Sequence, residues 1–417
     1  MLVGFFANVA EWYDFSIYAF LATTMGMLFL NSEHPKIALI RAFFLFTVSY
    51  IARPIGSIFW GYYGDLYGRK KALKWCLILM AIPTVFIGIL PTYRSIGIAA
   101  SFSLFIFRVV QGFAAGGELP MSACYVYEIV PQEKKAFYCS VVAASPMVGV
   151  LLGSITSFFI YLCFTQKEIL QYAWRIPFLF GVIVLFFILY IRRNIDETAA
   201  FKKEDTKNNT LSKYFFSLCS LSNLKKMFPI ITLYIFIQSS FYLLFLWMPS
   251  YLNIFLSVSK NKSFLSNSIG IFSLVIFTVI VGYYADRIQY KKIIIFGITT
   301  ISIMALPLFL LLQSKNFLLL IITQVFFAAC LSCIDGVIIN ILVRGFSAST
   351  RCGSVNLAFT LPSTIFGGIL PTLCSYLIYK TGFNLIPVLF LGCIGLMVLP
   401  VMVKSKSIYI ASHGGVD

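Results

Sequence analysis

Charged residues are scarce in this chain of 417 residues. Only 11% of its residues are Asp, Glu, Lys or Arg, whereas 60% are hydrophobic, and the mean hydropathy is +0.91. A soluble protein has about 25% charged and roughly 45–50% apolar residues. No water-soluble core hides such an apolar excess, so the composition excludes a soluble enzyme.

Histidine is also scarce, which limits the available chemistry. The two histidines, His34 and His413, lie outside the long apolar runs, so no Ser–His or Cys–His catalytic pair can be assembled there. The one CxxC pair, Cys330 and Cys333, falls short of the four ligands of a structural zinc site. The sequence also lacks the G-x-x-x-x-G-K-[ST] phosphate loop of a primary pump. We therefore expect no enzyme activity, no metal and no cofactor.

Long apolar runs are what the chain has in abundance. A bilayer core about 30 Å thick needs about 20 apolar residues per helix, and periodicity inside the runs is poor, as in helices that are apolar all round. The first run starts near Met1 without a basic n-region or cleavage site, so we expect it to be a retained helix. The sequence predicts an all-α membrane protein with twelve transmembrane helices at residues 2–31, 40–63, 72–91, 96–120, 137–163, 174–192, 228–253, 264–284, 292–312, 316–342, 352–379 and 383–403.

The net charge of +17 comes mainly from Lys and Arg in alternate loops, such as residues 69–74, 192–226 and 287–292. The positive-inside rule predicts that these loops, and with them both termini, are cytoplasmic. Basic loops also favour the anionic lipids of the bilayer. No separate basic domain is present, so we expect no nucleic-acid partner.

A polar segment divides the predicted spans into six and six, and it indicates an internal repeat. Residues 62–71 read YYGDLYGRKK and residues 283–292 read YYADRIQYKK. Two six-helix pseudo-symmetric halves related about the membrane normal are a transporter architecture, with substrate bound near the midplane. The predicted domains are an amino-terminal half, a cytoplasmic linker, a carboxy-terminal half and a short cytoplasmic tail, at residues 1–192, 193–227, 228–403 and 404–417.

The motif G-x-x-x-D-x-x-G-R-K at residues 61–70 resembles the signature of the major facilitator superfamily. Further motifs resemble its metabolite:proton symporter branch, the proline/betaine and 2-oxoglutarate permeases. These motifs are Asn8-x-x-EWYDF, RPIG (53–56), R-x-x-QG-x-x-x-GGE (108–118), WRIPF (174–178) and RR-x-x-DET (192–198).

The resemblance implies a secondary transporter of the bacterial inner membrane that works by alternating access, functions as a monomer and couples transport to protons. The substrate would be a small molecule with a carboxylate, either a zwitterion of the proline/betaine type or a dicarboxylate such as 2-oxoglutarate. A channel or a non-transporting receptor on the same scaffold is the alternative from another class, and in-membrane acids argue against it.

Ionisable residues inside the predicted spans are functional candidates, because each costs at least about 2.5–3.5 kcal/mol at the bilayer centre. Span 1 carries Asn8, Glu11 and Asp14 at steps of three, which puts the two acids near one helix face with Tyr18 alongside. Close carboxylates repel each other in a low dielectric, which favours a proton on one of them. The alternative is permanent pairing with arginines of spans 2 and 4.

Arg53 and Arg108 are the arginines near the predicted midplane. Arg53 precedes Asp65 by about 18 Å of helix, and Gln324 stands at the repeat position of Arg108. A guanidinium holds a carboxylate in two parallel hydrogen bonds, so Arg108 is a candidate for the substrate carboxylate or for switching between Glu11 and Asp14. Its motif adds Gln111 and Glu118, an acid placed to relay protons or close a gate.

The second half offers Gln238, Tyr242 and Trp247 on span 7 and the lone acid Asp335 on span 10. Aromatic faces attract quaternary ammonium groups. Trp12, Tyr18, Tyr242 and Trp247 would form an aromatic cage for betaine, although 17% of the chain is aromatic and most such residues pack or face lipid.

The repeated loop motif predicts a cytoplasmic latch between the halves. Gly64 and Gly68 would make the tight turn after span 2, and Asp65 would pair with a helix end of the other half. One predicted cluster joins Asp65, Arg69, Glu128 and Arg351, and its repeat joins Asp286 and Lys135. The family pattern has an acid at position 344 where this chain has Arg344, so we expect an asymmetric latch, weaker under the second half.

Replacing Arg344 with glutamate should restore an acid to the weaker half of the latch and shift the conformational balance toward the outward-facing state. Thiol labelling of cysteines on the cytoplasmic side measures this shift, and we expect slower labelling in the variant. Unchanged accessibility of these cysteines would contradict the asymmetric latch.

Overall fold

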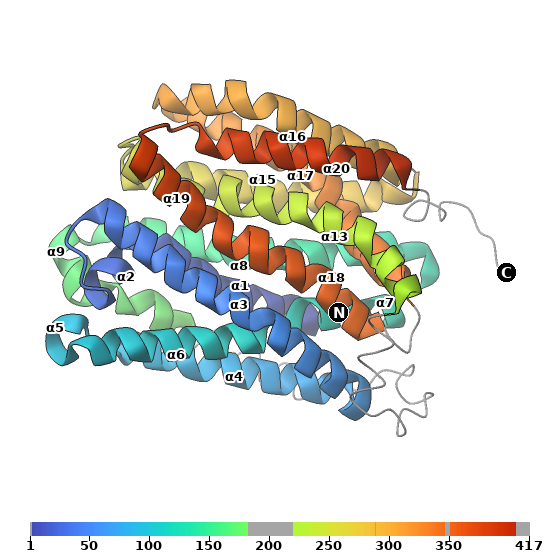
Figure 1. Ribbon diagram of the computed structural model, residues 1–417, viewed down its shortest axis with the longest axis horizontal. Helices are drawn as coiled ribbons and strands as arrows, with labels where there is room; N and C mark the ends of the chain where they lie inside the picture. The colour runs from blue at the N-terminus through green and yellow to red at the C-terminus, as the bar shows by residue number, and fades with distance from the viewer. Residues whose placement is uncertain (1, 182–219, 288, 347–350, 406–417) are drawn as a thin grey trace.

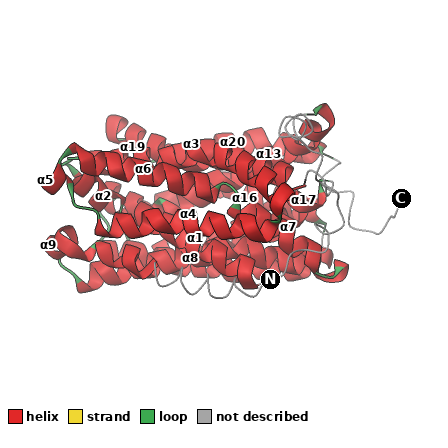
Figure 2. Cartoon of the chain, turned by 90° about the horizontal axis from the view of Figure 1, so that it is seen from below, coloured by secondary structure: helices red, strands yellow, loops and turns green. Residues whose placement is uncertain are grey.

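The computed structural model describes residues 2–181, 220–287, 289–346 and 351–405, and regular structure within them is helical throughout. The long helices lie side by side along one axis of the molecule (Figure 1), and the view from below shows the same bundle (Figure 2). The predicted all-α membrane fold is confirmed.

Two sets of helices build the bundle. The elements before residue 182 are α1 (Leu2–Phe20), α2 (Ala22–Phe29), α3 (Pro35–Tyr67), α4 (Arg69–Ile89), α5 (Tyr93–Ile96), α6 (Ile98–Ala115), α7 (Glu118–Ile129), η1 (Gln132–Lys134), α8 (Lys135–Cys163), α9 (Gln166–Glu168) and η2 (Ile169–Ala173). Those after residue 219 are α13 (Leu221–Phe241), η4 (Tyr242–Leu246), α14 (Met248–Ser250), η5 (Tyr251–Phe255), α15 (Lys260–Tyr284), η6 (Ala285–Arg287), α16 (Tyr290–Gln313), α17 (Phe317–Arg344), α18 (Arg351–Pro362), η8 (Ser363–Ile369), α19 (Leu370–Thr381) and α20 (Ile386–Lys404).

Ten helices among the described residues are long and apolar enough to cross a bilayer. The predicted first span corresponds to α1 and α2, which are separated at Leu21. The predicted sixth span begins as a helix at 175–181 and continues beyond the described residues. These assignments agree with twelve spans.

The predicted linker and tail lie mostly outside the described residues. Helix α13 begins at Leu221, earlier than the predicted span start at residue 228, because the Ser220 hydroxyl accepts a hydrogen bond from the Asn223 N–H and caps the helix. Lys225 and Lys226 are exposed in its first turns, so the helix extends past its apolar part. The sequence pattern located only that apolar part.

The two sets of helices pack against each other along α1, α8, α15 and α17. Helix α8 packs against both α1 and α15, and α15 also packs against α17. On the other side, α3 contacts α18, η8 and α19. The two sets therefore meet along two regions, one where α8 contacts α15 and α17 and one where α3 contacts α18, η8 and α19.

Glycines allow the close approach of α3 and α6. A Cβ at Gly56 would lie 2.0 Å from the Phe113 carbonyl oxygen, and one at Gly112 would lie 1.9 Å from the Ser49 carbonyl oxygen. Membrane helices lack a hydrophobic driving force for association, so backbone contact between small residues supplies packing energy. This contact fixes Arg53 and Arg108, which lie on these two helices, relative to each other.

The prediction that Gly64 and Gly68 share a tight turn is wrong for Gly64. Gly64 lies inside helix α3, which ends at Tyr67. Only Gly68 has the positive φ, 99°, that a side chain disfavours. The turn between α3 and α4 is therefore made by one glycine, because both helices run up to it.

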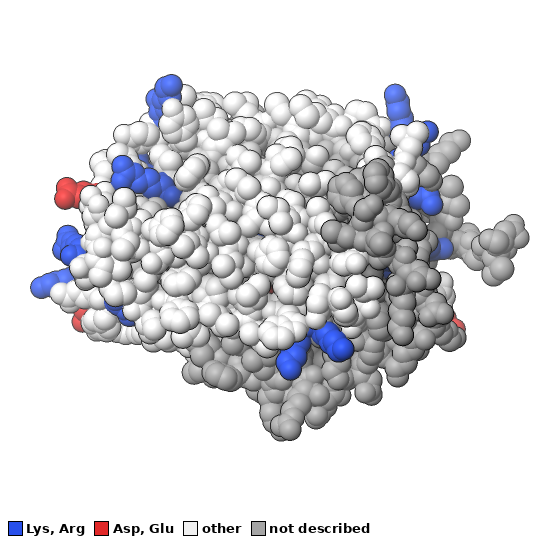
Figure 3. Space-filling view, turned by 60° about the horizontal axis from the view of Figure 1, so that its bottom comes forward, with Lys and Arg blue, Asp and Glu red and all other residues white. Residues whose placement is uncertain are grey.

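Exposed charges lie mostly toward the two ends of the molecule. In Figure 3 most Lys and Arg lie at the left and right, two groups lie at the lower edge beside the grey atoms, and the wide white area above them shows no charge on this face. Large hydrophobic side chains such as Phe102, Leu396 and Met397 are exposed by more than 60%. An apolar belt between charged ends matches a bilayer.

Replacing Gly112 with alanine should destabilise the protein, because the added methyl group meets the backbone of Ser49. Overpacking of this kind costs about 1–3 kcal/mol, so thermal unfolding in detergent should begin at a lower temperature. Gly392→Ala is the matched control, since a Cβ at this helical glycine meets nothing within 4 Å. Equal unfolding temperatures for the two variants would contradict the close contact of α3 and α6.

Candidate functional site

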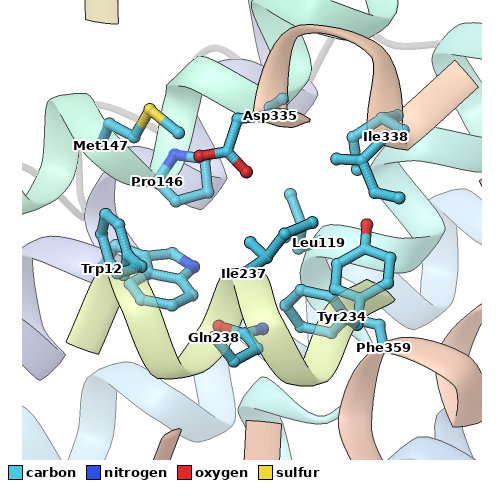
Figure 4. Close-up of a pocket in the computed structure, with 13 residues that line it drawn as sticks. Trp12, Leu119, Pro146, Met147, Tyr234, Ile237, Gln238, Asp335, Ile338 and Phe359 are labelled. Carbon is cyan, nitrogen blue, oxygen red and sulfur yellow. The ribbon is translucent and has the colours of Figure 1, made fainter. Parts of the chain in front are cut away.

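A cavity with about 440 Å³ of empty space, part of it open to solvent, lies between the two sets of helices (Figure 4). Helices α1, α7 and α8 form one side of it, and α13, α17 and α18 form the other. Its lining residues are Trp12, Leu119, Ala143, Pro146, Met147, Tyr234, Ile237, Gln238, Phe241, Asp335, Ile338, Ile339 and Phe359. A cavity lined mainly by apolar and aromatic side chains with a few polar groups has the usual make-up of a small-molecule site.

Polar groups are few in this cavity, and several have no partner. One carboxylate oxygen of Asp335, the hydroxyl of Tyr234 and the indole nitrogen of Trp12 are buried without a hydrogen-bond partner among the described residues. The side-chain amide nitrogen of Gln238 has a hydrogen-bond partner, because it donates to the Ser363 hydroxyl at 2.8 Å. No Lys or Arg is among the described lining residues.

Aromatic side chains form much of the remaining wall. Trp12 and Phe241 meet edge to face with ring centroids 5.7 Å apart. Tyr234 and Phe359 meet edge to face at 5.4 Å. Of the four aromatics predicted as a cage, only Trp12 lines this cavity; the others in the wall come from positions that sequence reasoning missed.

The predicted charged residues of the first half form a second, separate cluster. A carboxylate oxygen of Glu11 lies 3.6 Å from a guanidinium nitrogen of Arg53, and both side chains are at most 2% exposed. The Arg53 guanidinium also lies over the rings of Tyr50 at 4.0 Å and Phe15 at 4.3 Å. These aromatic faces offset part of the cost of burying the cation.

Asp14 is held by an amide. The Gln111 side-chain nitrogen donates to an Asp14 carboxylate oxygen at 2.6 Å and lies 3.0 Å from the Thr84 hydroxyl oxygen. Arg108 lies over the Tyr18 ring at 3.6 Å, and its guanidinium nitrogens have no hydrogen-bond partner within the described part of the chain. Arg108 is therefore held by an aromatic face and retains its hydrogen-bonding capacity.

Glu11 and Asp14 line a small cavity of their own, together with Thr84 and side chains of α4. Arg53 and Arg108 belong to neither set of lining residues. The structure thus separates the predicted acids of span 1 from the cavity between the halves. Trp12 connects the two regions, because it lines the larger cavity and its ring centroid is 5.7 Å from the Arg53 guanidinium.

A hydroxyl pair joins the halves beside this cluster. The hydroxyls of Tyr50 and Tyr242 are hydrogen-bonded to each other. A Cβ at Gly367 would lie 2.8 Å from the Tyr242 ring, and one at Gly368 would lie 2.6 Å from the Tyr50 side chain. The two glycines of the π-helical segment η8 therefore make room for the pair, and Tyr50 is a site residue that sequence reasoning missed.

Three more predicted site residues are buried, and one of them, Glu118, lies close enough to Glu11 for their charges to interact. The Asn8 amide donates to the Ser145 hydroxyl at 2.9 Å and ties α1 to α8. Glu118, 2% exposed, begins α7. Trp247 donates to the Ser375 hydroxyl at 2.9 Å, and its ring centroid is 5.0 Å from that of Tyr251. The structure therefore does not bring Trp247 to the cavity.

Part of the predicted latch is formed. Glu128 at the end of α7 pairs with Arg351 at the start of α18, with 3.0 Å between carboxylate oxygen and guanidinium nitrogen. Lys135 lies over the Tyr127 ring at 3.9 Å, and Arg344 is exposed. The side chains of Asp65, Arg69 and Asp286 lie outside the described set.

The sequence pattern of the Major Facilitator Superfamily matches residues 2–371. The chain belongs to this family. The "Proline/betaine transporter" of Salmonella typhimurium is 29% identical over 407 residues, covering 96% of this chain and 81% of the relative. The "Glycine betaine/proline/ectoine/pipecolic acid transporter" of Dickeya dadantii is 28% identical over 398 residues, covering 94% and 79%.

Solved structures of the superfamily share the fold. The xylose transporter of E. coli in a partially occluded inward open conformation superposes with a TM-score of 0.77 at 17% identity, covering 97% of this chain and 96% of that one. The human organic anion transporter MFSD10 gives a TM-score of 0.67 at 13% identity, covering 96% and 98%. The chain is a multi-pass transporter with the twelve-helix fold of the superfamily, built from two six-helix halves.

Replacing Glu128 with arginine should separate the halves at this end, because it turns the ion pair with Arg351 into a repulsion. We expect faster maleimide labelling of Cys139, which is 1% exposed, in the purified protein. The charge swap Glu128→Arg with Arg351→Glu should return labelling toward the wild-type rate.

Glu133→Arg is the matched control, since Glu133 is an exposed acid of the neighbouring segment η1. A charge swap that labels as fast as the single Glu128 variant would show that the ion pair does not hold this end closed.

Proposed function

We propose that this transporter is a proton-coupled symporter of a small zwitterionic osmolyte of the proline/betaine type, working by alternating access. The observation that carries the proposal is the cavity between the halves, with one acid, several aromatic rings and no Lys or Arg among its described lining residues. An acid in this cavity attracts an ammonium group and repels a dianion. It therefore favours a zwitterion over the dicarboxylate alternative, and the similar proline/betaine transporters agree with this choice.

Proton coupling is supported by the charge balance of the buried cluster in the first half. Glu11, Asp14 and Glu118 are three acids, and Arg53 and Arg108 are two cations, each at most 5% exposed. An uneven buried charge is costly in a membrane, and one proton on Glu11 or Asp14 removes the imbalance. These two acids are the proposed proton carriers.

Alternating access is supported by contacts on both sides of the cavity. Glu128 and Arg351 pair across the halves at the predicted cytoplasmic end. Toward the other end, the hydroxyls of Ser154 on α8 and Ser268 on α15 lie 2.8 Å apart. Alternating access requires each contact to break while the other holds.

The location and state of assembly are part of the proposal. We place the protein in a bacterial inner membrane with both termini in the cytoplasm, acting as a monomer without enzyme activity. Lys and Arg concentrate in every other loop, and the positive-inside rule places those loops in the cytoplasm, which supports this orientation.

Uptake of labelled proline, glycine betaine and 2-oxoglutarate into proteoliposomes tests the proposal. An inward proton gradient should drive saturable accumulation of proline or betaine, and a protonophore should abolish it. In Asp14→Asn, uphill accumulation should fall at least about tenfold while exchange of internal for external substrate persists, because exchange needs no net proton movement.

A preference for 2-oxoglutarate would support the dicarboxylate alternative instead. Flux that does not saturate would indicate a channel, and binding without flux would indicate a receptor. Accumulation that a protonophore leaves intact would contradict proton coupling.

A further inference from the structure

Three buried polar groups without partners belong to the wall of the cavity between the halves. Asp335, Tyr234 and Trp12 are 3–4% exposed, and each presents an atom without a hydrogen-bond partner among the described residues. Figure 4 shows the Asp335 carboxylate and the Trp12 indole nitrogen pointing toward the middle of the cavity, with the Tyr234 ring on the side opposite Trp12.

Leaving such groups unpaired is costly. A buried donor or acceptor without a partner costs about 1–3 kcal/mol, and a carboxylate costs more because it is charged. No Lys or Arg is among the described residues of the wall, so the lining supplies no cation for Asp335. A ligand that brings both a cation and an acceptor offsets these costs.

The three groups differ in whether they donate or accept hydrogen bonds. The Asp335 carboxylate accepts hydrogen bonds and attracts cations, whereas the Trp12 N–H is a donor and the Tyr234 O–H donates or accepts. The faces and edges of Phe241 and Phe359 lie beside them in the same wall, and aromatic faces stabilise alkylated ammonium groups. The cavity is therefore negative at Asp335 and offers donors at Trp12 and Tyr234.

We propose that Asp335 binds the ammonium group of the substrate and that Trp12 and Tyr234 donate hydrogen bonds to its carboxylate. The ligand class is a small zwitterion with a secondary or quaternary ammonium near a carboxylate. No arginine is needed to bind the substrate carboxylate, so Arg53 and Arg108 stay in the charged cluster with Glu11 and Asp14. This inference rests on the proposed function and assigns its substrate subsites.

A pair of isosteres separates the ammonium contact from general packing. In 3,3-dimethylbutanoate a carbon replaces the quaternary nitrogen of glycine betaine, so the shape and the carboxylate stay while the positive charge is lost. Equilibrium binding of both compounds to the purified full-length protein is measured by calorimetry for the wild type, Asp335→Asn and Asp335→Glu. Betaine transport by the same preparations is measured in proteoliposomes.

The wild type should prefer betaine over the isostere by about tenfold to a hundredfold, because a charge pair in a desolvated site is lost with the isostere. Asp335→Asn should abolish most of this preference, and Asp335→Glu should keep part of it. Tyr234→Phe should weaken binding of both compounds by a similar factor, since both carry the carboxylate.

Ser332→Ala is the matched control on the same helix. Ser332 is 1% exposed and its hydroxyl donates to the Ala329 carbonyl oxygen of its own helix, and it is not part of the cavity wall. Its betaine preference should equal that of the wild type.

Two results overturn the inference and are distinguishable. If the wild type transports betaine but Asp335→Asn and Asp335→Glu both discriminate as the wild type does, the subsite assignment is wrong and the proposed function stands. If the wild type binds neither betaine nor proline, both fail together. If Asp335→Asn does not fold, the betaine preference of Asp335→Glu and the binding loss in Tyr234→Phe decide the assignment.

Discussion

The cost of placing charge in the low-dielectric interior of a bilayer governs this structure. Each buried ionisable group costs several kcal/mol unless it is paired or solvated. The five charged residues of the first-half cluster are accordingly gathered among aromatic rings and amides, as in the position of Arg53 over Tyr50 and Phe15. Asp335 is the exception, an acid in a cavity without a described cation in its wall, and this makes it informative about the ligand.

The interface between the halves is joined near the midplane by neutral groups. Tyr50 pairs with Tyr242, the hydroxyls of Thr47 and Thr372 are 3.0 Å apart, and Thr364 donates to the Tyr50 carbonyl oxygen at 2.9 Å. Each such bond contributes only about 0.5–1.5 kcal/mol net. An interface of this kind can be rearranged at low cost, as the proposed alternating access requires.

The sequence predicted the spans, because a membrane helix must be apolar along its length and that requirement is visible without the structure. It also placed Glu11 and Asp14 on one face of span 1, and both line the same cavity. The sequence did not decide which residues pair with these acids, because Arg53 and Arg108 were alternatives for either one. Tertiary packing pairs Glu11 with Arg53 and Asp14 with Gln111.

The wall of the larger cavity was mostly beyond sequence reasoning. Tyr234, Phe241 and Phe359 differ in no local way from the other aromatic residues of a chain that is 17% aromatic. Asp335 was visible as an in-membrane acid, but its place in the cavity depends on how α17 packs against α8 and α13. Gly64 was misassigned because a glycine in a repeated loop motif reads as a turn, whereas here it continues a helix.

The proposed sites place the substrate in the cavity between the halves and the coupling proton on Glu11 or Asp14, in separate compartments. An experimental structure with bound glycine betaine tests this separation most directly. Ligand density is expected in the cavity between the halves, in contact with Asp335 and Trp12, and none is expected against Glu11 or Arg108. Density for the ligand carboxylate on Arg53 or Arg108 inside the first half would contradict it.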